Sequence, residues 1–89
     1  MKTIDKPWGH EVWFAQHKKY LGKILVIEKG HRLSRQYHRI KHETLYVLRG
    51  RLVLELGRSR KVLVSGQAFA VPPGTVHRFS APHGRVTLL

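Results

Sequence analysis

Four side chains that can bind a metal ion occur in two short stretches of this sequence. Gln36 and His38 are two residues apart, Glu43 follows five residues later, and His77 comes near the end of the chain. Residues two apart on a strand point to one face, so Gln36 and His38 share a face if their stretch is a strand. Glu43 can open the next strand after a tight turn, and His77 can begin a strand after the turn at 72–75. In a small barrel these four side chains would converge on one ion.

This set of donors suits a divalent cation. Two imidazoles, one carboxylate and one amide oxygen fit zinc, manganese, nickel, iron or cobalt in a site with open coordination positions. We expect one ion per chain, with zinc first among these metals. His42 is the rival ligand, but it neighbours Glu43 and would point to the other face of a regular strand. The predicted metal ligands are therefore Gln36, His38, Glu43 and His77.

The elements that would position these ligands are predicted to be short β-strands. Apolar and polar residues alternate with a period of two, and β-branched and aromatic residues are enriched. No stretch of ten residues free of Gly and Pro has a helical period. This pattern predicts an all-β fold, a jelly-roll-like barrel of about eight to nine short antiparallel strands. The predicted strands cover residues 11–15, 21–28, 33–38, 43–48, 51–56, 61–64, 68–71, 77–80 and 85–89.

Size and composition limit the class of protein. The 89 residues are expected to form one domain, residues 1–89, and 42% of them are hydrophobic, enough for a modest core. The chain has no cysteine, which excludes a disulfide framework and a thiolate metal site. No apolar run is long enough for a membrane-spanning helix, and the first residues lack the apolar segment of a signal peptide. We therefore expect a cytoplasmic protein with no membrane association.

The charge balance is strongly basic. Seventeen Lys and Arg residues against five Asp and Glu residues give a formal net charge of +12. Such an excess favours an anionic partner through long-range attraction, although a merely well-solvated surface could carry it too. The basic residues are spread over turns and outward strand positions, without an aromatic-interleaved motif or a recognition helix. Nucleic acid is therefore not expected, and the predicted partner is a small anion such as a phosphorylated or carboxylated molecule.

Two residues near the predicted ligands are candidates for binding substrate. Ser34 would share the face of Gln36 and His38 on a regular strand. Lys23 interrupts an otherwise apolar strand. Its ammonium group either faces the mouth of the barrel and binds phosphate or extends outward to solvent.

A homodimer is also expected. Trp8 and Trp13 near the start of the chain would pack against the outside of the barrel or against a partner subunit. Together with strands that are apolar on both faces, they give more apolar surface than one small core can cover.

Two spaced motifs resemble those of the cupin superfamily. The first has Gln36 where that family usually has its first His, and the second has Ala81 where it usually has Asn. The matching positions are Gly30, His38, Glu43 and Gly50 in the first motif and Gly66, Pro72, Gly74 and His77 in the second. Gln-x-His followed by Glu, with residues 6–9 and 30–38, is similar to the C-terminal domain of mannose-6-phosphate isomerases and their mannose-1-phosphate guanylyltransferase relatives.

The resemblance implies a single metal-binding cupin domain and, as its activity, aldose–ketose isomerisation of mannose 6-phosphate. The metal would polarise the substrate carbonyl and the adjacent hydroxyl, while a base moves a proton between two carbons. Lys23, His42 and a metal-bound hydroxide are the candidates for that base, and none is assigned. Two alternatives stay open: a non-catalytic module that holds a sugar or small anion, and a metal-dependent dioxygenase. Cupin dioxygenases mostly carry His where Gln36 stands. The family usually continues the last strand beyond Leu89 by several residues.

Overall fold

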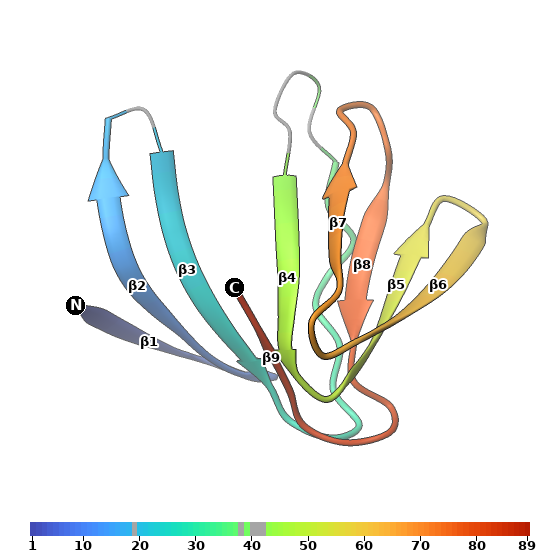
Figure 1. The fold of residues 1–89 in the computed structure, drawn as a ribbon, viewed down its shortest axis with the longest axis horizontal. Coiled ribbons are helices and arrows are strands. Elements are labelled where there is room, and N and C mark those ends of the chain that lie inside the picture. The colour runs from blue at the N-terminus through green and yellow to red at the C-terminus, as the bar shows by residue number, and fades with distance from the viewer. Residues whose placement is uncertain (19, 38, 40–42) are drawn as a thin grey trace.

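The regular secondary structure of the described residues consists of β-strands joined by turns and loops. This computed structural model describes residues 1–18, 20–37, 39 and 43–89, without the side chain of residue 20. Two sheets pack face to face, with strand orders β1-β2-β3-β9-β4-β7 and β6-β5-β8, and Figure 1 shows their arrangement. The jelly-roll-like all-β fold is thereby confirmed. The strands are β1 (Lys2–Lys6), β2 (Gly9–His17), β3 (Tyr20–Ile27), β4 (Glu43–Arg49), β5 (Arg51–Leu56), β6 (Ser59–Val64), β7 (Ala68–Val71), β8 (His77–Ser80) and β9 (Val86–Leu88).

Most strands have the predicted bounds or lie within a few residues of them. Three of them, β5, β7 and β8, begin and end where the alternation of apolar residues predicts. β1 is not among the predicted strands, because its five residues are mostly polar and only Ile4 is half-buried. β1 pairs with β2 alone and forms an edge of the large sheet, where charged residues are commonly found.

The predicted strand over residues 33–38 is wrong for its described residues. This segment makes two isolated bridges with β8, between Arg32 and Ser80 and between Gln36 and His77. The two bridges are four residues apart in this segment, from 32 to 36, but three residues apart in β8, from 77 to 80. One extra residue is therefore accommodated between the bridges. The extra residue breaks the alternation of faces, because Leu33 is buried and Gln36, three positions on, is half-buried. The regular alternation that would place Ser34 beside Gln36 is therefore not present.

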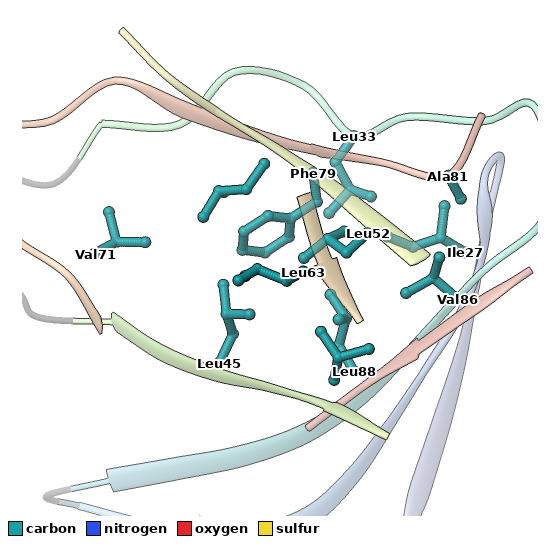
Figure 2. Close-up of a cluster of buried hydrophobic side chains, with 12 residues drawn as sticks. Ile27, Leu33, Leu45, Leu52, Leu63, Val71, Phe79, Ala81, Val86 and Leu88 are labelled. Atoms are coloured by element: carbon teal, nitrogen blue, oxygen red, sulfur yellow. The ribbon is translucent and has the colours of Figure 1, made fainter. Parts of the chain in front are cut away.

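The core lies between the two sheets. Figure 2 shows Leu45 and Leu88 of the large sheet and Phe79 and Leu63 of the small sheet pointing into the same space. These four side chains are at most 4% exposed. Burial of this kind is the main favourable term in the stability of such a small domain.

The short strand β9 joins the two halves of the large sheet. It lies between β3 and β4, and it pairs with residues 25–27 of β3. On its other side Leu88 pairs with Val47, and Leu89 exchanges two backbone hydrogen bonds with Tyr46, with N···O distances of 2.8 and 3.0 Å. Past this level the described part of the chain places no strand between β3 and β4, and Figure 1 shows the two strands standing apart above the C-terminus.

These two levels define two ends of the barrel. We call the closed end the level at which β9 completes the sheet, namely residues 25–27, 47–50 and 86–88. We call the open end the level beyond it, namely residues 14–17 of β2, residues 20–23 of β3 and residues 43–46 of β4.

Gly50 shows how tightly the closed end is assembled. It turns the chain from β4 into β5 with a φ of 92°, a conformation that other residues rarely adopt. A Cβ atom at this position would lie 2.4 Å from the carbonyl oxygen of Arg85. The turn therefore approaches the segment before β9 so closely that only glycine fits.

Candidate metal centre and adjoining cavity

The structure brings two of the predicted ligands together across the two sheets. Glu43 begins β4 and His77 begins β8. His77 Nε2 lies 3.1 Å from Glu43 Oε2, although the residues are 34 positions apart in sequence. His77 Nδ1 lies 3.1 Å from the carbonyl oxygen of Thr75. When Nδ1 donates to this carbonyl, Nε2 is left as the atom directed at the carboxylate.

This pair fits the chemistry of a divalent cation. Metal-binding histidines usually donate their second N–H to a backbone carbonyl or carboxylate, as His77 does to Thr75. Two ligands about 2.1 Å from one ion and roughly at right angles are about 3.0 Å apart, and the observed Nε2–Oε2 distance is 3.1 Å. The described residues alone contain no group of three His, Cys, Asp or Glu side chains that could hold a metal. The other predicted donors are the Gln36 amide and His38, which lies outside the described residues.

Gln36 is next to this pair through its backbone. Its N–H and C=O groups exchange hydrogen bonds with those of His77, with N···O distances of 2.8 and 2.9 Å. Its half-buried side chain lines the same cavity as Glu43. The extended segment before β4 therefore brings a third predicted ligand to the two that already meet.

A cavity of about 510 Å³ occupies the open end. Phe14, Leu21 and Leu25 supply apolar walls, and the polar groups that line it include Lys23, Gln36 and Glu43. The side chain of His77 is only 1% exposed, whereas that of Glu43 is 33% exposed. A ligand entering the cavity would therefore meet Glu43 first and His77 behind it.

Lys23 lies at the cavity wall in a cluster that the sequence analysis did not find. Its Nζ is 3.7 Å from Glu11 Oε1 and 4.9 Å from the centroid of the Trp13 ring. Trp13 Nε1 donates a hydrogen bond of 2.9 Å to the same carboxylate oxygen. Glu11 is only 8% exposed, and a buried carboxylate requires such partners. A signal was present in the sequence, because an acidic residue in an otherwise apolar strand calls for a cation on the strand beside it.

The remaining predicted residues are placed as follows. Ser34 is exposed and does not line the cavity, so its role in binding substrate stays a prediction. His42, like His38, lies outside the described residues. Trp8 packs against the core, while Trp13 has Lys2 Nζ 5.1 Å from its ring centroid in addition to Lys23.

An ion pair away from the cavity, between Arg78 and Glu55, lowers the pKa of the Glu55 carboxyl group. Arg78 Nε donates a hydrogen bond of 2.7 Å to Glu55 Oε2 on the small sheet. This hydrogen bond and the nearby charges of Arg78, Arg35 and Arg60 hold the pKa of Glu55 below its ordinary value.

The fold and the His–Glu pair define a small antiparallel β-barrel with a candidate metal centre at one end. A sequence model of the cupin domain matches residues 23–89, and the chain belongs to the cupin family. No curated protein matches the sequence significantly. The described residues include no helix long and apolar enough to cross a membrane.

Several solved structures share this fold. An RmlC-like cupin from Shewanella frigidimarina NCIMB 400 has a TM-score of 0.87 and 23% identity, covering 98% of this chain and 78% of that chain. KdgF from Halomonas sp. has a TM-score of 0.82 and 21% identity, covering 99% and 83%. Hydroxypropylphosphonic acid epoxidase from S. wedmorenis has a TM-score of 0.84 and 15% identity, covering 98% and 52%. At these identities the likeness establishes the fold alone.

Proposed function

We propose that this protein is a metal-dependent cupin that binds, and isomerises, a small sugar phosphate in the cavity at the open end. The observation that carries this proposal is the His77–Glu43 pair. Its 3.1 Å separation, with Nδ1 of His77 engaged by the Thr75 carbonyl, is suited to two ligands of one ion. Lys23 supplies a positive charge on the wall of the adjoining cavity.

In this proposal the metal is one divalent ion, zinc first, with manganese, nickel, iron and cobalt as alternatives. Gln36, His38, Glu43 and His77 would hold it, which combines nitrogen and oxygen donors and leaves positions for substrate. When bound, the ion would polarise a substrate carbonyl and the neighbouring hydroxyl.

Lys23 would bind the phosphate. A cavity of about 510 Å³ lies within the usual size of small-molecule sites, about 300–1,000 Å³. The side chain of Lys23 remains 32% exposed even though its Nζ lies near Glu11. The net charge of +12 would also attract an anion from solution.

A non-catalytic binding module is the second candidate, and one observation favours it. The side chains lining the cavity that could carry a proton are Lys23, Glu43 and Tyr46. Lys23 is engaged by Glu11, and Glu43 by His77. The described residues therefore offer Tyr46 as the remaining acid–base group, so a base for isomerisation is not evident among them.

Metal binding is the first test. Calorimetric titration of the metal-free protein with zinc should give one site per chain, and Glu43→Gln and His77→Ala should each weaken it at least 100-fold. His83→Ala, at an exposed histidine, is the matched control and should bind like the parent. Circular dichroism would verify that each variant is folded. A folded parent protein that binds no divalent ion, or equal affinity in all variants, would contradict the proposal.

Substrate turnover is the second test. The metal-loaded protein should convert mannose 6-phosphate to fructose 6-phosphate, and a chelator should abolish the reaction. Binding of the sugar phosphate without turnover would leave the binding module as the function. If the protein neither binds nor converts the sugar phosphate, a sugar phosphate is excluded as its ligand.

We also propose a homodimer. Exposed apolar side chains include Phe14, Leu21, Val62 and Val64, which are between 43% and 52% exposed. These side chains lie on β2, β3 and β6, and burying them against a second copy would stabilise a dimer. Light scattering at micromolar concentration should give about twice the 10.3 kDa mass of the chain, and the mass of one chain would refute the dimer.

A further inference from the structure

A second hollow, of about 550 Å³, adjoins the closed end of the barrel. Its walls are the turn from β4 into β5, the start of the connection from β6 to β7, and the loop before β9, which meet on one side of the molecule (Figure 1). The residues that line it are 50–51, 64–65 and 83–85. None of these described residues lines the cavity at the open end. The hollow is therefore a separate place on the molecule, which neither the candidate metal centre nor the sugar phosphate uses.

The walls of this hollow are fixed by backbone contacts. Gly50 approaches the loop before β9 so closely that a Cβ atom would lie 2.4 Å from the carbonyl oxygen of Arg85. The connection from β6 to β7 is bonded to β4 in both directions. Gly66 N–H donates to the Val47 carbonyl at 2.8 Å, and Val47 N–H donates to the Gln67 carbonyl at 2.9 Å. Because the walls are already fixed, a ligand would bind there with little ordering of the chain.

The charged groups that line the hollow are cationic. Two guanidinium groups, those of Arg51 and Arg85, line it together with the imidazole of His83, and no acidic side chain of the described residues does. Glu28 Oε1 accepts a hydrogen bond of 2.8 Å from Arg85 Nε. That bond uses one of the five N–H donors of a guanidinium group. The Arg85 side chain is 67% exposed, so it is accessible to a ligand from solution.

Two neighbouring residues narrow the kind of anion that fits. Arg51 and Val64 are directly opposite each other in the ladder of β5 and β6, so their side chains lie side by side on one face. Val64 is 43% exposed, although it is apolar. Ser65 follows it in the wall and carries a hydroxyl that can donate a hydrogen bond. The hollow therefore offers donors for an anionic group and an apolar surface for a body attached to it.

We propose that this hollow binds the phosphate group of a small phosphomonoester. Such a group carries between one and two negative charges at neutral pH and presents three acceptor oxygens. Guanidinium groups match these oxygens with pairs of parallel N–H donors. The volume of about 550 Å³ exceeds the need of a phosphate ion alone and leaves space for an organic body against Val64.

The test is an NMR titration of the protein with phenyl phosphate, in the absence of metal so that the phosphate cannot bind an ion. The amide signals of Arg51, Ser65 and Gly84 should shift and reach saturation at millimolar ligand. Lys23→Ala, in the wall of the other cavity, should leave these shifts and their midpoint unchanged. Failure of this proposal and failure of the proposed sugar-phosphate site are therefore read at different amides. No saturable shift at these three amides, or one that Lys23→Ala abolishes, would overturn the proposal.

Charge variants separate a local site from general attraction. Arg51→Ala and Arg85→Ala should each raise the dissociation constant about fivefold or more, because each removes a guanidinium group from the hollow. Arg58→Ala is the matched control, since it removes the same charge from the turn between β5 and β6. Glu28→Gln breaks the ion pair but keeps Arg85, so this variant should bind at least as tightly as the parent. Equal losses in Arg51→Ala and Arg58→Ala, or in Arg85→Ala and Glu28→Gln, would contradict the proposal.

Two further probes test the chemistry of the ligand. Dimethyl phosphate has the diester linkage of nucleic acids and a single charge, so it should bind about fivefold more weakly or less. Inorganic phosphate lacks the apolar body and should also bind more weakly than phenyl phosphate, and Val64→Ser should remove this preference. Dimethyl phosphate that binds as tightly as phenyl phosphate would indicate a phosphodiester partner instead. That result, or a preference for phenyl phosphate that Val64→Ser leaves unchanged, would refute the phosphomonoester site.

Discussion

The closed and open ends of the barrel are built from the same strands and differ in what lies between them. At the closed end Ile27 of β3, Val47 of β4 and Val86 of β9 are fully buried. At the open end Leu21, on the same strand as Ile27, is 47% exposed, and Phe14 is 43% exposed. Two of the predicted ligands, Gln36 and Glu43, line the cavity there. The comparison teaches that one long strand can contribute a buried part that stabilises the fold, such as Ile27 of β3, and a more exposed part that lines the cavity, such as Leu21.

The largest expected effect compares two apolar residues of β3. Ile27→Ala should lower the free energy of unfolding by about 3 kcal/mol, because it leaves a cavity among buried side chains. Leu21→Ala should lower it by less than about 1 kcal/mol, because this side chain is already half exposed. Urea unfolding of both variants measures the difference. Equal destabilisation would show that the two ends are packed alike.

The next effect compares two glycines with positive φ. Gly50→Ala should destabilise the protein by about 2 kcal/mol or more for two reasons. The new Cβ would clash with the Arg85 carbonyl, and the φ at this position is unfavourable for alanine. Gly30 has a φ of 83° and open space around it, so Gly30→Ala should lose only about 1 kcal/mol. Thermal unfolding would rank the two variants. If Gly50→Ala is less destabilising than Gly30→Ala, the backbone at the closed end can shift to accommodate the added Cβ.

A smaller effect is expected at the wall of the open end. Lys23→Ala should raise the dissociation constant for mannose 6-phosphate about tenfold, with little change in turnover, because a phosphate anchor contributes mainly uniform binding. Lys2→Ala is the matched control, since Lys2 contacts the same Trp13 ring but does not line the cavity. Calorimetry should show no change for that variant. If Lys23→Ala and Lys2→Ala lose the same affinity, the overall positive charge of the protein attracts the ligand and Lys23 is not a local phosphate anchor.

The smallest effect lies away from both ends, on the small sheet. The lowered pKa of Glu55 means that its ionised form is favoured by folding, mainly through the Arg78 hydrogen bond. Its contribution is present above the ordinary pKa of 4.5 and is lost as the pH falls through the lower pKa of the folded state. Glu55→Gln should therefore reduce stability at pH 7 by less than about 1 kcal/mol and flatten its acid dependence. Unfolding curves at pH 7 and pH 3 would measure this, and a variant with unchanged acid dependence would disagree.

The sequence predicted the regular, well-buried strands better than the edge strand β1 and the irregular segment before β4. Strands such as β5 and β8 alternate regularly or are buried on both faces, so their bounds follow from hydrophobic pattern. The strand predicted over 33–38 failed because one extra residue lies between its two bridges to β8. Nothing in the residue types marks such a bulge. β1 was missed because its pairing with β2, and not its own composition, makes it a strand.

The candidate site was predicted in part. The meeting of Glu43 with His77 agrees with the motif spacing. The spacing could not show the contact between Glu11 and Lys23, because it depends on the register of β2 against β3 and on a bulge near residue 14.

The His77–Glu43 pair also has a meaning for the order of folding. Glu43 lies on the large sheet and His77 on the small one, so neither hairpin formation nor assembly of either sheet alone brings the two side chains together. Their contact is made only when the sheets dock, a late and strongly non-local event. If the pair binds a metal as proposed, a spectroscopic metal such as cobalt, added during refolding, would report the moment at which the two sheets are docked.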